Sequence, residues 1–113
     1  METKQPDVGE KPKPVKIFKM ANVSQGYKMA TRVGRFEGRL EFNTKSRFCS
    51  SAIRIMIDDE EIGYVPKEMV GEVLEFIGQR DVYPCRGTIN SSYDQYVEQF
   101  YFWGECVVDQ PDV

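Results

Sequence analysis

The chain has 113 residues, a length that fits one compact domain, because single hydrophobic cores are commonest near this size. Hydrophobic residues form 41% of it and charged residues 29%, which provides enough apolar material for a core and excludes wholesale disorder. The formal net charge is -3, and the absence of histidine excludes Ser-His-Asp and Cys-His catalysis, histidine-ligated zinc and a histidine pH switch.

Residues 1–14 are predicted to be a flexible tail, since three of the six prolines and six charged side chains lie there. We expect a single domain over residues 15–108 and a short C-terminal tail over residues 109–113. The first residues contain no apolar stretch of the kind found in signal peptides, and no apolar run approaches about 18 residues. A cytoplasmic protein without a membrane-spanning segment is therefore expected.

The first half of the domain is predicted to form short strands. Apolar residues alternate imperfectly with polar ones there, and glycine-containing pairs offer turns between the alternating stretches. A polar run with only two apolar members then indicates a loop. The expected elements are strands at residues 15–23, 27–33 and 39–43, turns at residues 25–26 and 35–38, and a loop at residues 43–51.

A β-hairpin and a helix are expected next. The stretch Ala52–Ile57 and residues 61–65 flank an acidic turn, with alternate isoleucines on one face. Pro66 suits the first turn of a helix, where its missing N-H costs nothing, and Gly78 suits its end. Between them the apolar residues follow helical spacing and form one stripe: Met69, Val70, Val73, Leu74 and Ile77.

Two strands at residues 82–90 and 96–108 are predicted to close the fold, because both stretches are rich in Tyr, Phe and Val. Ser91-Ser92 is predicted to be the loop between them, and Phe100, Phe102 and Trp103 are interpreted as core or barrel rim. The element order predicts a mainly β fold. We expect a small OB-like or SH3-like β-barrel with an amphipathic helix at about residues 66–77.

Charge is distributed unevenly along the chain. Residues 11–54 contain eleven basic side chains and two acidic ones, whereas residues 55–113 contain three basic and thirteen acidic ones. A basic half of this kind can bind phosphates whatever the net charge of the whole chain. Alternatively, the two halves interleave in the fold and neutralise each other across strands.

No metal site, cofactor or catalytic constellation is expected. The three cysteines, Cys49, Cys85 and Cys106, are odd in number and far apart, which is typical of free thiols in a reducing cytoplasm. The acidic run at residues 58–61 lacks the alternating spacing of a calcium loop. The chain has neither a P-loop nor a glycine-rich dinucleotide motif, so we expect a protein that is not an enzyme.

Three motifs in order resemble the HIRAN domain family over roughly residues 15–106. They are S-R-F-C-S-S-A-I-R-I at residues 46–55, I-G-Y-V-P-K-E at residues 62–68 and F-W-G at residues 102–104. The family has an N-P-Y-D-x-x-A-I-x-V segment, followed by an I-G-Y-V-P-K-E-like segment that opens a helix. The resemblance, closest to the standalone bacterial or phage members, implies an OB-like barrel that binds single-stranded DNA at a 3' end without chemistry.

The resemblance also implies a binding site. Phe48 matches the family aromatic that stacks on a base, Lys67 matches a lysine that contacts phosphate, and Tyr64 lies beside the same pocket. Cys49 stands where the family has the Asp that receives the 3'-hydroxyl, and a thiol is a poor acceptor, so the N-P-Y-D loop is degenerate and end recognition is left open. The other candidate contacts to nucleic acid are Lys45, Arg47, Arg54, Tyr27 and Lys28.

Two functions from different classes follow. The leading hypothesis is a non-enzymatic module that binds nucleic acid, single-stranded DNA above all, and the alternative is a protein-interaction or structural adaptor, including a homo-oligomer. Phe48 either stacks on a base or folds into the barrel as a plug, while Lys67 either meets phosphate or pairs with a neighbouring glutamate. A positive groove favours DNA, whereas neutralised stripes or an apolar patch favour the adaptor.

Overall fold

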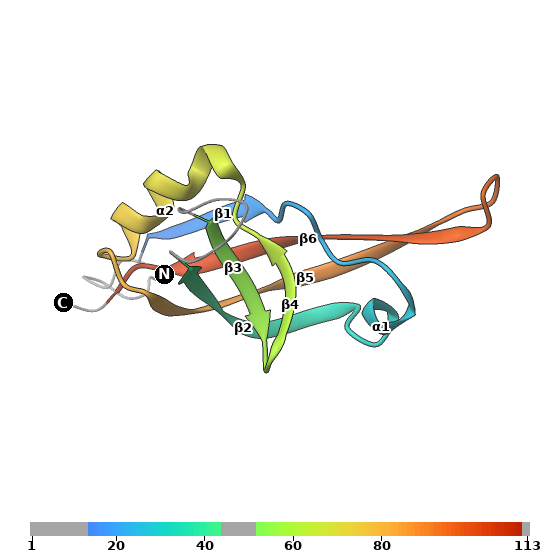
Figure 1. Cartoon of the computed structure of the whole chain (residues 1–113), viewed down its shortest axis with the longest axis horizontal. Helices are drawn as coiled ribbons and strands as arrows, with labels where there is room; N and C mark the ends of the chain where they lie inside the picture. Colours follow the sequence, from blue (N-terminus) through green and yellow to red (C-terminus); the bar gives the residue numbers. More distant parts are fainter. Residues whose placement is uncertain (1–13, 44–51, 112–113) are drawn as a thin grey trace, which may run out of the picture.

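The computed structural model describes residues 14–43 and 52–111. Six antiparallel strands form one sheet in the order β1-β6-β5-β2-β3-β4, which curls into a half-barrel (Figure 1). The mainly β fold predicted from the sequence is confirmed. The elements are β1 Val15–Lys19, α1 Tyr27–Ala30, β2 Gly34–Asn43, β3 Ala52–Ile57, β4 Glu60–Tyr64, the 3-10 helix η1 Lys67–Met69, α2 Val70–Phe76, β5 Val82–Asp94 and β6 Gln99–Asp109.

The segment after β1 closes the curled sheet against β4. Ala21 and Tyr64 exchange two backbone hydrogen bonds of 2.7 and 2.8 Å, and the Ser24 N-H donates to the Ile62 carbonyl at 2.9 Å. The Met20 N-H donates to the Gly104 carbonyl at 2.9 Å, so the same segment also extends the pairing of β1 with β6 by one residue. The two ends of the strand order are therefore joined by residues 20–24.

The hydrophobic core lies on the inner face of the curl. Leu40 and Phe42 of β2 face Ile55 and Ile53 of β3 in register, as the alternating sequence predicts. The helix predicted at residues 66–77 is present as η1 followed by α2, which lies beside the curled sheet (Figure 1). The apolar stripe of this helix packs in or against the core cluster. Val73 of this helix is fully buried in the same core cluster.

Two predictions for the first half are wrong. Residues 27–33, expected to be a strand, instead begin with the single helical turn α1 at Tyr27–Ala30, because Gly26 breaks the extended chain at a φ of 111° and the turn buries Met29. Residues 35–38, expected to be a turn, lie inside β2, where Phe36 points to the core and its neighbours point outward. The predicted loop at residues 43–51 lies almost wholly outside the described residues.

The closing strands are longer than predicted. Ser91 and Ser92, expected to form the loop, continue β5, and the turn falls at residues 95–98 instead. The Asp94 side chain fixes that turn, since its Oδ1 accepts a hydrogen bond of 2.8 Å from the Tyr96 N-H. The two strands therefore extend beyond the barrel as a long ribbon (Figure 1).

Aromatic residues near the start of β6 divide between core and solvent. Phe102 is buried, as expected, but Phe100 and Trp103 are 58% and 42% exposed. Phe100 lies where the ribbon has left the barrel, whereas Trp103 lies between the buried residues Phe102 and Gly104 and faces outward.

Cys85 and Cys106 are free thiols buried in the core. A hydrogen bond between the two side chains and burial raise the pKa of the Cys106 thiol far above its usual range. Both sulfurs therefore behave as small apolar groups, as expected for structural cysteines. Cys49 lies outside the described residues.

A substitution at Gly87 tests the packing of the inner face. A Cβ added there would lie 2.7 Å from the Phe36 ring and would also meet the Glu105 carbonyl, so Gly87→Ala should destabilise the fold by about 1 to 3 kcal/mol. Gly71 on α2 has no atom within 4 Å of its added Cβ. The matched variant Gly71→Ala should therefore stabilise the protein by about 0.5 to 1 kcal/mol. Urea unfolding measures both changes, and equal midpoints for Gly87→Ala and the parent would contradict the packing.

Candidate nucleic-acid interface

Arg54 and Tyr64 are direct neighbours on the outer face of the sheet. Arg54 in β3 is the register partner of Tyr64 at the end of β4 and of Glu41 in β2, so the three side chains form one row across three strands. This row runs beside Asn43 and Ala52, the paired strand residues between which the predicted loop lies. The backbone register therefore brings Arg54 and Tyr64 together at the end of the sheet where the resemblance predicts a site.

Carboxylates on both sides hold the Arg54 guanidinium. Its Nη2 donates to Glu41 Oε1 at 2.8 Å, and its Nη1 lies 3.7 Å from Glu61 Oε1. Arg39 donates through Nε to the other oxygen of Glu41. The Arg54 Nε is buried and has no hydrogen-bond partner. Arg54 is thus fixed in place with its charge balanced and one donor unused.

These contacts set the protonation of the row. The Arg39 guanidinium, which donates a hydrogen bond to Glu41, and Arg54 beside it lower the pKa of the Glu41 carboxyl. Burial and the nearby Glu61 carboxylate raise the pKa of the Tyr64 phenol. At neutral pH the row therefore contains an ionised Glu41 and an uncharged Tyr64.

Two exposed lysines lie at the same end of the sheet. Lys67 begins η1 three residues after Tyr64. The antiparallel bridge between Ala21 and Tyr64 directs Lys19, two residues earlier in the chain, toward Pro66 and Lys67. Lys19 was not selected from the sequence, because no local pattern reveals that the segment after β1 returns to β4.

Tyr27 and Lys28 are not brought to this end. Residues 21–24 run antiparallel to β4, from its last residue toward its first. The chain therefore reaches α1 only after it has passed the start of β4. Arg32, which follows α1, accordingly donates to Glu60, the first residue of β4, at 2.8 Å. Of the predicted site residues, Lys45, Arg47, Phe48 and Cys49 lie outside the described residues.

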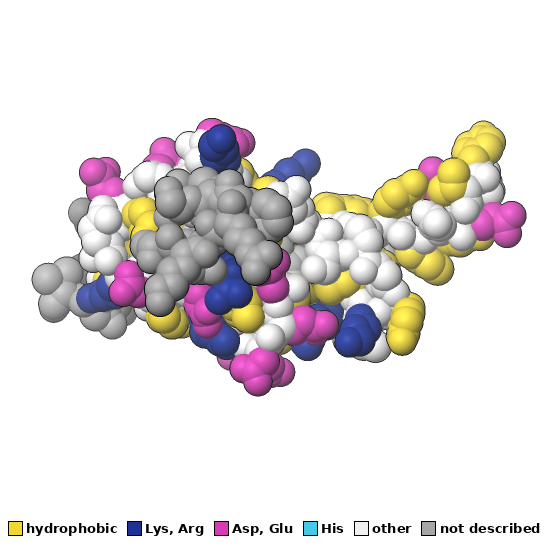
Figure 2. Space-filling view, viewed as in Figure 1, with side chains coloured by type: hydrophobic (Ala, Val, Ile, Leu, Met, Phe, Trp, Pro, Cys, Tyr) yellow, Lys and Arg dark blue, Asp and Glu magenta, His cyan; other side chains and the backbone are white. Residues whose placement is uncertain are grey.

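Many basic side chains are neutralised by acidic ones. Figure 2 shows Lys and Arg interspersed with Asp and Glu over the part of the body that is not drawn in grey. Within residues 14–43 and 52–111, three ion pairs join the basic and acidic parts of the sequence, as the interleaving alternative predicts: Lys16–Glu72, Arg32–Glu60 and Arg54–Glu61. Exposed pairs of this kind add little stability but weaken the local positive potential.

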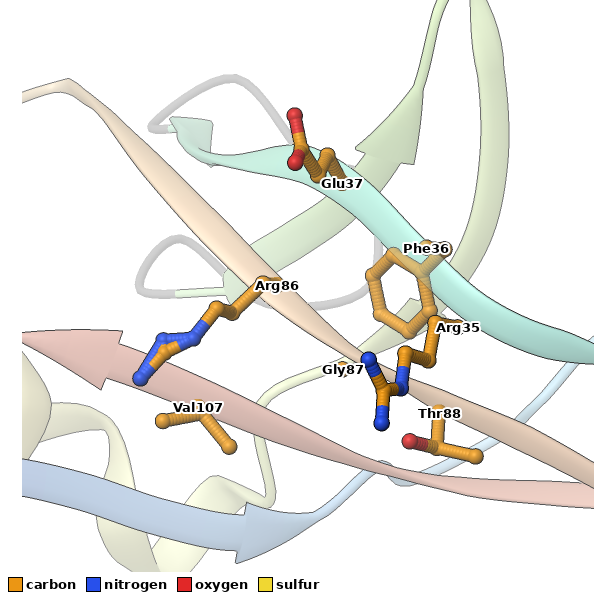
Figure 3. A pocket seen from close by; sticks show the side chains of 7 residues that line it. All are labelled: Arg35, Phe36, Glu37, Arg86, Gly87, Thr88 and Val107. Atoms are coloured by element: carbon orange, nitrogen blue, oxygen red, sulfur yellow. The ribbon is translucent and has the colours of Figure 1, made fainter.

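A shallow pocket of about 470 Å³ lies further along β2, on the same outer face. In Figure 3 the Arg35 and Arg86 side chains extend to the same side of β5, near Thr88 and Val107. Arg86 is paired with Asp109 at 3.2 Å. Sequence reasoning did not select this pair, because cross-strand pairing of β2 with β5 is what makes Arg35 and Arg86 neighbours.

Three further observations concern metal binding, membrane spanning and similarity to known proteins. Among residues 14–43 and 52–111, no cluster of three metal-ligating side chains occurs. No helix in these ranges has the length and hydropathy needed to cross a membrane. Comparisons with protein-family models, curated proteins and solved structures found no match to this chain. The HIRAN resemblance therefore stays a prediction.

Glu41 gives the row a measurable pH dependence. Since the fold lowers its pKa, its ionised form adds stability that is fully present above the ordinary value of 4.5 and is lost as pH falls through the lowered value. The stability difference between the parent protein and Glu41→Gln should thus be largest above about pH 5 and shrink toward about pH 3. Urea unfolding across that range checks it.

Glu75→Gln, on the exposed face of α2, is the matched control and should change the pH dependence far less. A stability difference for Glu41→Gln that stayed constant with pH would show that Arg39 and Arg54 do not hold the Glu41 carboxylate in solution.

Proposed function

We propose that this protein is a non-enzymatic module that binds single-stranded nucleic acid, DNA above all, at the end of the sheet where β2, β3 and β4 meet. The observation that carries the proposal is the cross-strand pair of Arg54 and Tyr64, next to the paired strand ends Asn43 and Ala52. The order of the HIRAN-like motifs at residues 46–55 and 62–68 supports it independently. The same resemblance supports a site that acts by binding alone.

The chemistry divides between fixed and exposed groups. Arg54 is held by Glu41 and Glu61, so it positions the surface, while Lys67 and Lys19 are exposed and available to phosphate. Tyr64 is uncharged at neutral pH and does not repel a phosphate. Phe48 supplies the stacking surface in this proposal, with Lys45 and Arg47 beside it. The two glutamates keep the number of phosphate contacts small.

The salt dependence of the binding affinity measures the number of phosphate contacts. With Lys19, Lys67, Lys45 and Arg47 as the contacts, about four phosphates are neutralised, so the logarithm of the association constant should fall with the logarithm of salt concentration with a slope of about -3. Fluorescence anisotropy with a labelled oligonucleotide gives this slope. Lys67→Ala and Lys19→Ala should each make it shallower by about 0.7.

Lys28→Ala is the matched control and should leave the slope unchanged, because Lys28 lies beyond the far end of β4. Absence of binding at low salt with about 50 µM protein would refute the proposal, since counterion release favours binding most strongly under those conditions. Running the same titration with free and phosphorylated 3' ends tests end recognition. With Cys49 at the family's Asp position, we expect little preference for the free hydroxyl.

Glu61 opposes phosphate in this arrangement. Its carboxylate lies 3.7 Å from the Arg54 guanidinium, so Glu61→Gln should free positive charge and raise the affinity for single-stranded DNA severalfold at low salt. Glu75→Gln on α2 removes the same charge elsewhere and should have a smaller effect. Equal gains for the two variants would mean that net charge alone, and not this row, governs binding.

A second candidate function is protein interaction, and a different surface favours it. The ribbon formed by β5 and β6 exposes several aromatic side chains outside the barrel.

A further inference from the structure

The hairpin arm, which we define as residues 90–103, has no neighbouring strand on either edge among the described residues. β2 pairs with β5 only as far as Ile89, and β1 pairs with β6 only as far as Glu105. Beyond Met20, the β6 edge is covered at one point, where the Gln25 side-chain amide exchanges hydrogen bonds of 2.8 and 2.9 Å with Phe102. An isolated two-stranded ribbon is at best marginally stable in water, and its free N-H and C=O groups invite a further strand.

Both faces of the hairpin arm are aromatic. Tyr93 and Phe100 pack together on one face with ring centroids 5.0 Å apart, and Tyr101 and Trp103 lie on the other. The exposed side chains are Tyr93 (51%), Tyr96 (90%), Val97 (53%), Phe100 (58%), Tyr101 (45%) and Trp103 (42%). Figure 2 shows this apolar surface on the part of the molecule that protrudes from the body. Such concentrated exposure marks an interaction surface.

The area suits a second copy of the chain. Taking about 200 Å² for a whole aromatic side chain, the five exposed rings offer about 550 Å² per copy, or about 1,100 Å² for two copies. Stable interfaces bury about 1,200 to 2,000 Å². The rings reach this range once Val97 and the open strand edges are added.

Charge determines the relative direction of the arms of two copies. The hairpin arm carries Asp94 and Glu98 at its tip, and residues 87–111 contain no Lys or Arg, so the arm repels phosphate. At its foot, Gln25 ties the arm to the start of α1, where Tyr27 is 84% exposed and Lys28 is exposed beside it. An antiparallel arrangement would place each acidic tip against the basic foot of the other copy.

We propose that the hairpin arm is a homodimerisation arm. Two copies lay their arms edge to edge and antiparallel about a two-fold axis, so that rings on each face contact rings of the other copy across the seam and Glu98 of each copy lies near Lys28 of the other. A two-fold interface of this kind uses the same patch on both copies and closes after two subunits. The proposal does not depend on nucleic-acid binding, because it uses a different surface.

Sedimentation velocity over a concentration series tests the arm. The parent chain should form dimers, whereas Tyr96→Ser/Phe100→Ser should raise the dissociation constant at least tenfold. The matched control Ile17→Ser/Val82→Ser changes two side chains of similar exposure outside the arm, and it should dimerise like the parent.

A chain with a shortened arm shows whether loss of the dimer results from misfolding. Replacing residues 92–101 by an Asn-Gly turn removes most of the arm, and no buried core residue lies between residues 90 and 101. This variant should melt cooperatively and sediment as a monomer.

Charge reversal tests the direction. Glu98→Lys and Lys28→Glu should each weaken the dimer severalfold, and the double variant should restore it, because the new charges attract across the interface. Glu98 is preferable to Asp94, whose side chain fixes the turn. A parent chain that is monomeric at about 100 µM, a shortened chain that still dimerises, or a double variant without recovery would overturn the proposal.

Discussion

Closure of the sheet by the backbone pair between Ala21 and Tyr64 is the constraint on which the rest of the structure depends. The strand order begins with β1 and ends with β4, and without this bridge both edges would be open. The bridge makes one inner face that the core and α2 can fill. It also determines which outer side chains meet, since it brings the start of the chain beside the end of β4.

The closed sheet then explains how the charges are arranged. Acidic and basic segments that are separate in the sequence become neighbouring strands, so Arg54 lies between Glu41 and Glu61. Arginine held in this way is a poor attractor of phosphate but a rigid part of a surface. Any attraction for nucleic acid must therefore come from exposed lysines and from the residues between β2 and β3. The exposed aromatic arm carries no positive charge and belongs to a separate surface.

The sequence predicted the elements that depend on local patterns. The β3–β4 hairpin follows from the alternating isoleucines, and the helix after Pro66 follows from its apolar spacing and from Gly78. The loop predicted at Ser91 and Ser92 is wrong because serine favours a turn only where the chain must bend, and a solvated ribbon accepts serine equally well. The position of Arg54 beside Tyr64 could be anticipated from the hairpin, but its two glutamate partners could not.

Long-range pairing was beyond local reasoning. Only the Ala21–Tyr64 bridge directs Lys19 toward the start of η1, and Arg35 meets Arg86 only through the pairing of β2 with β5. The exposure of Phe100 depends on where β1 and β2 stop covering the last two strands. No pattern within those strands reveals where their neighbours end.

The pairing of β1 with β6 has a consequence for folding kinetics. Val15 is opposite Asp109, and the Gln110 N-H donates to the Pro14 carbonyl at 3.1 Å, so these partners are separated by nearly the whole described chain. The β5–β6 hairpin is local and can form within microseconds, but the pairing with β1 closes a very long loop. During synthesis, β1 must wait for β6 before it has a partner. Phe18, the buried apolar residue of β1, stays uncovered until then, which makes this interval the one most exposed to misassociation.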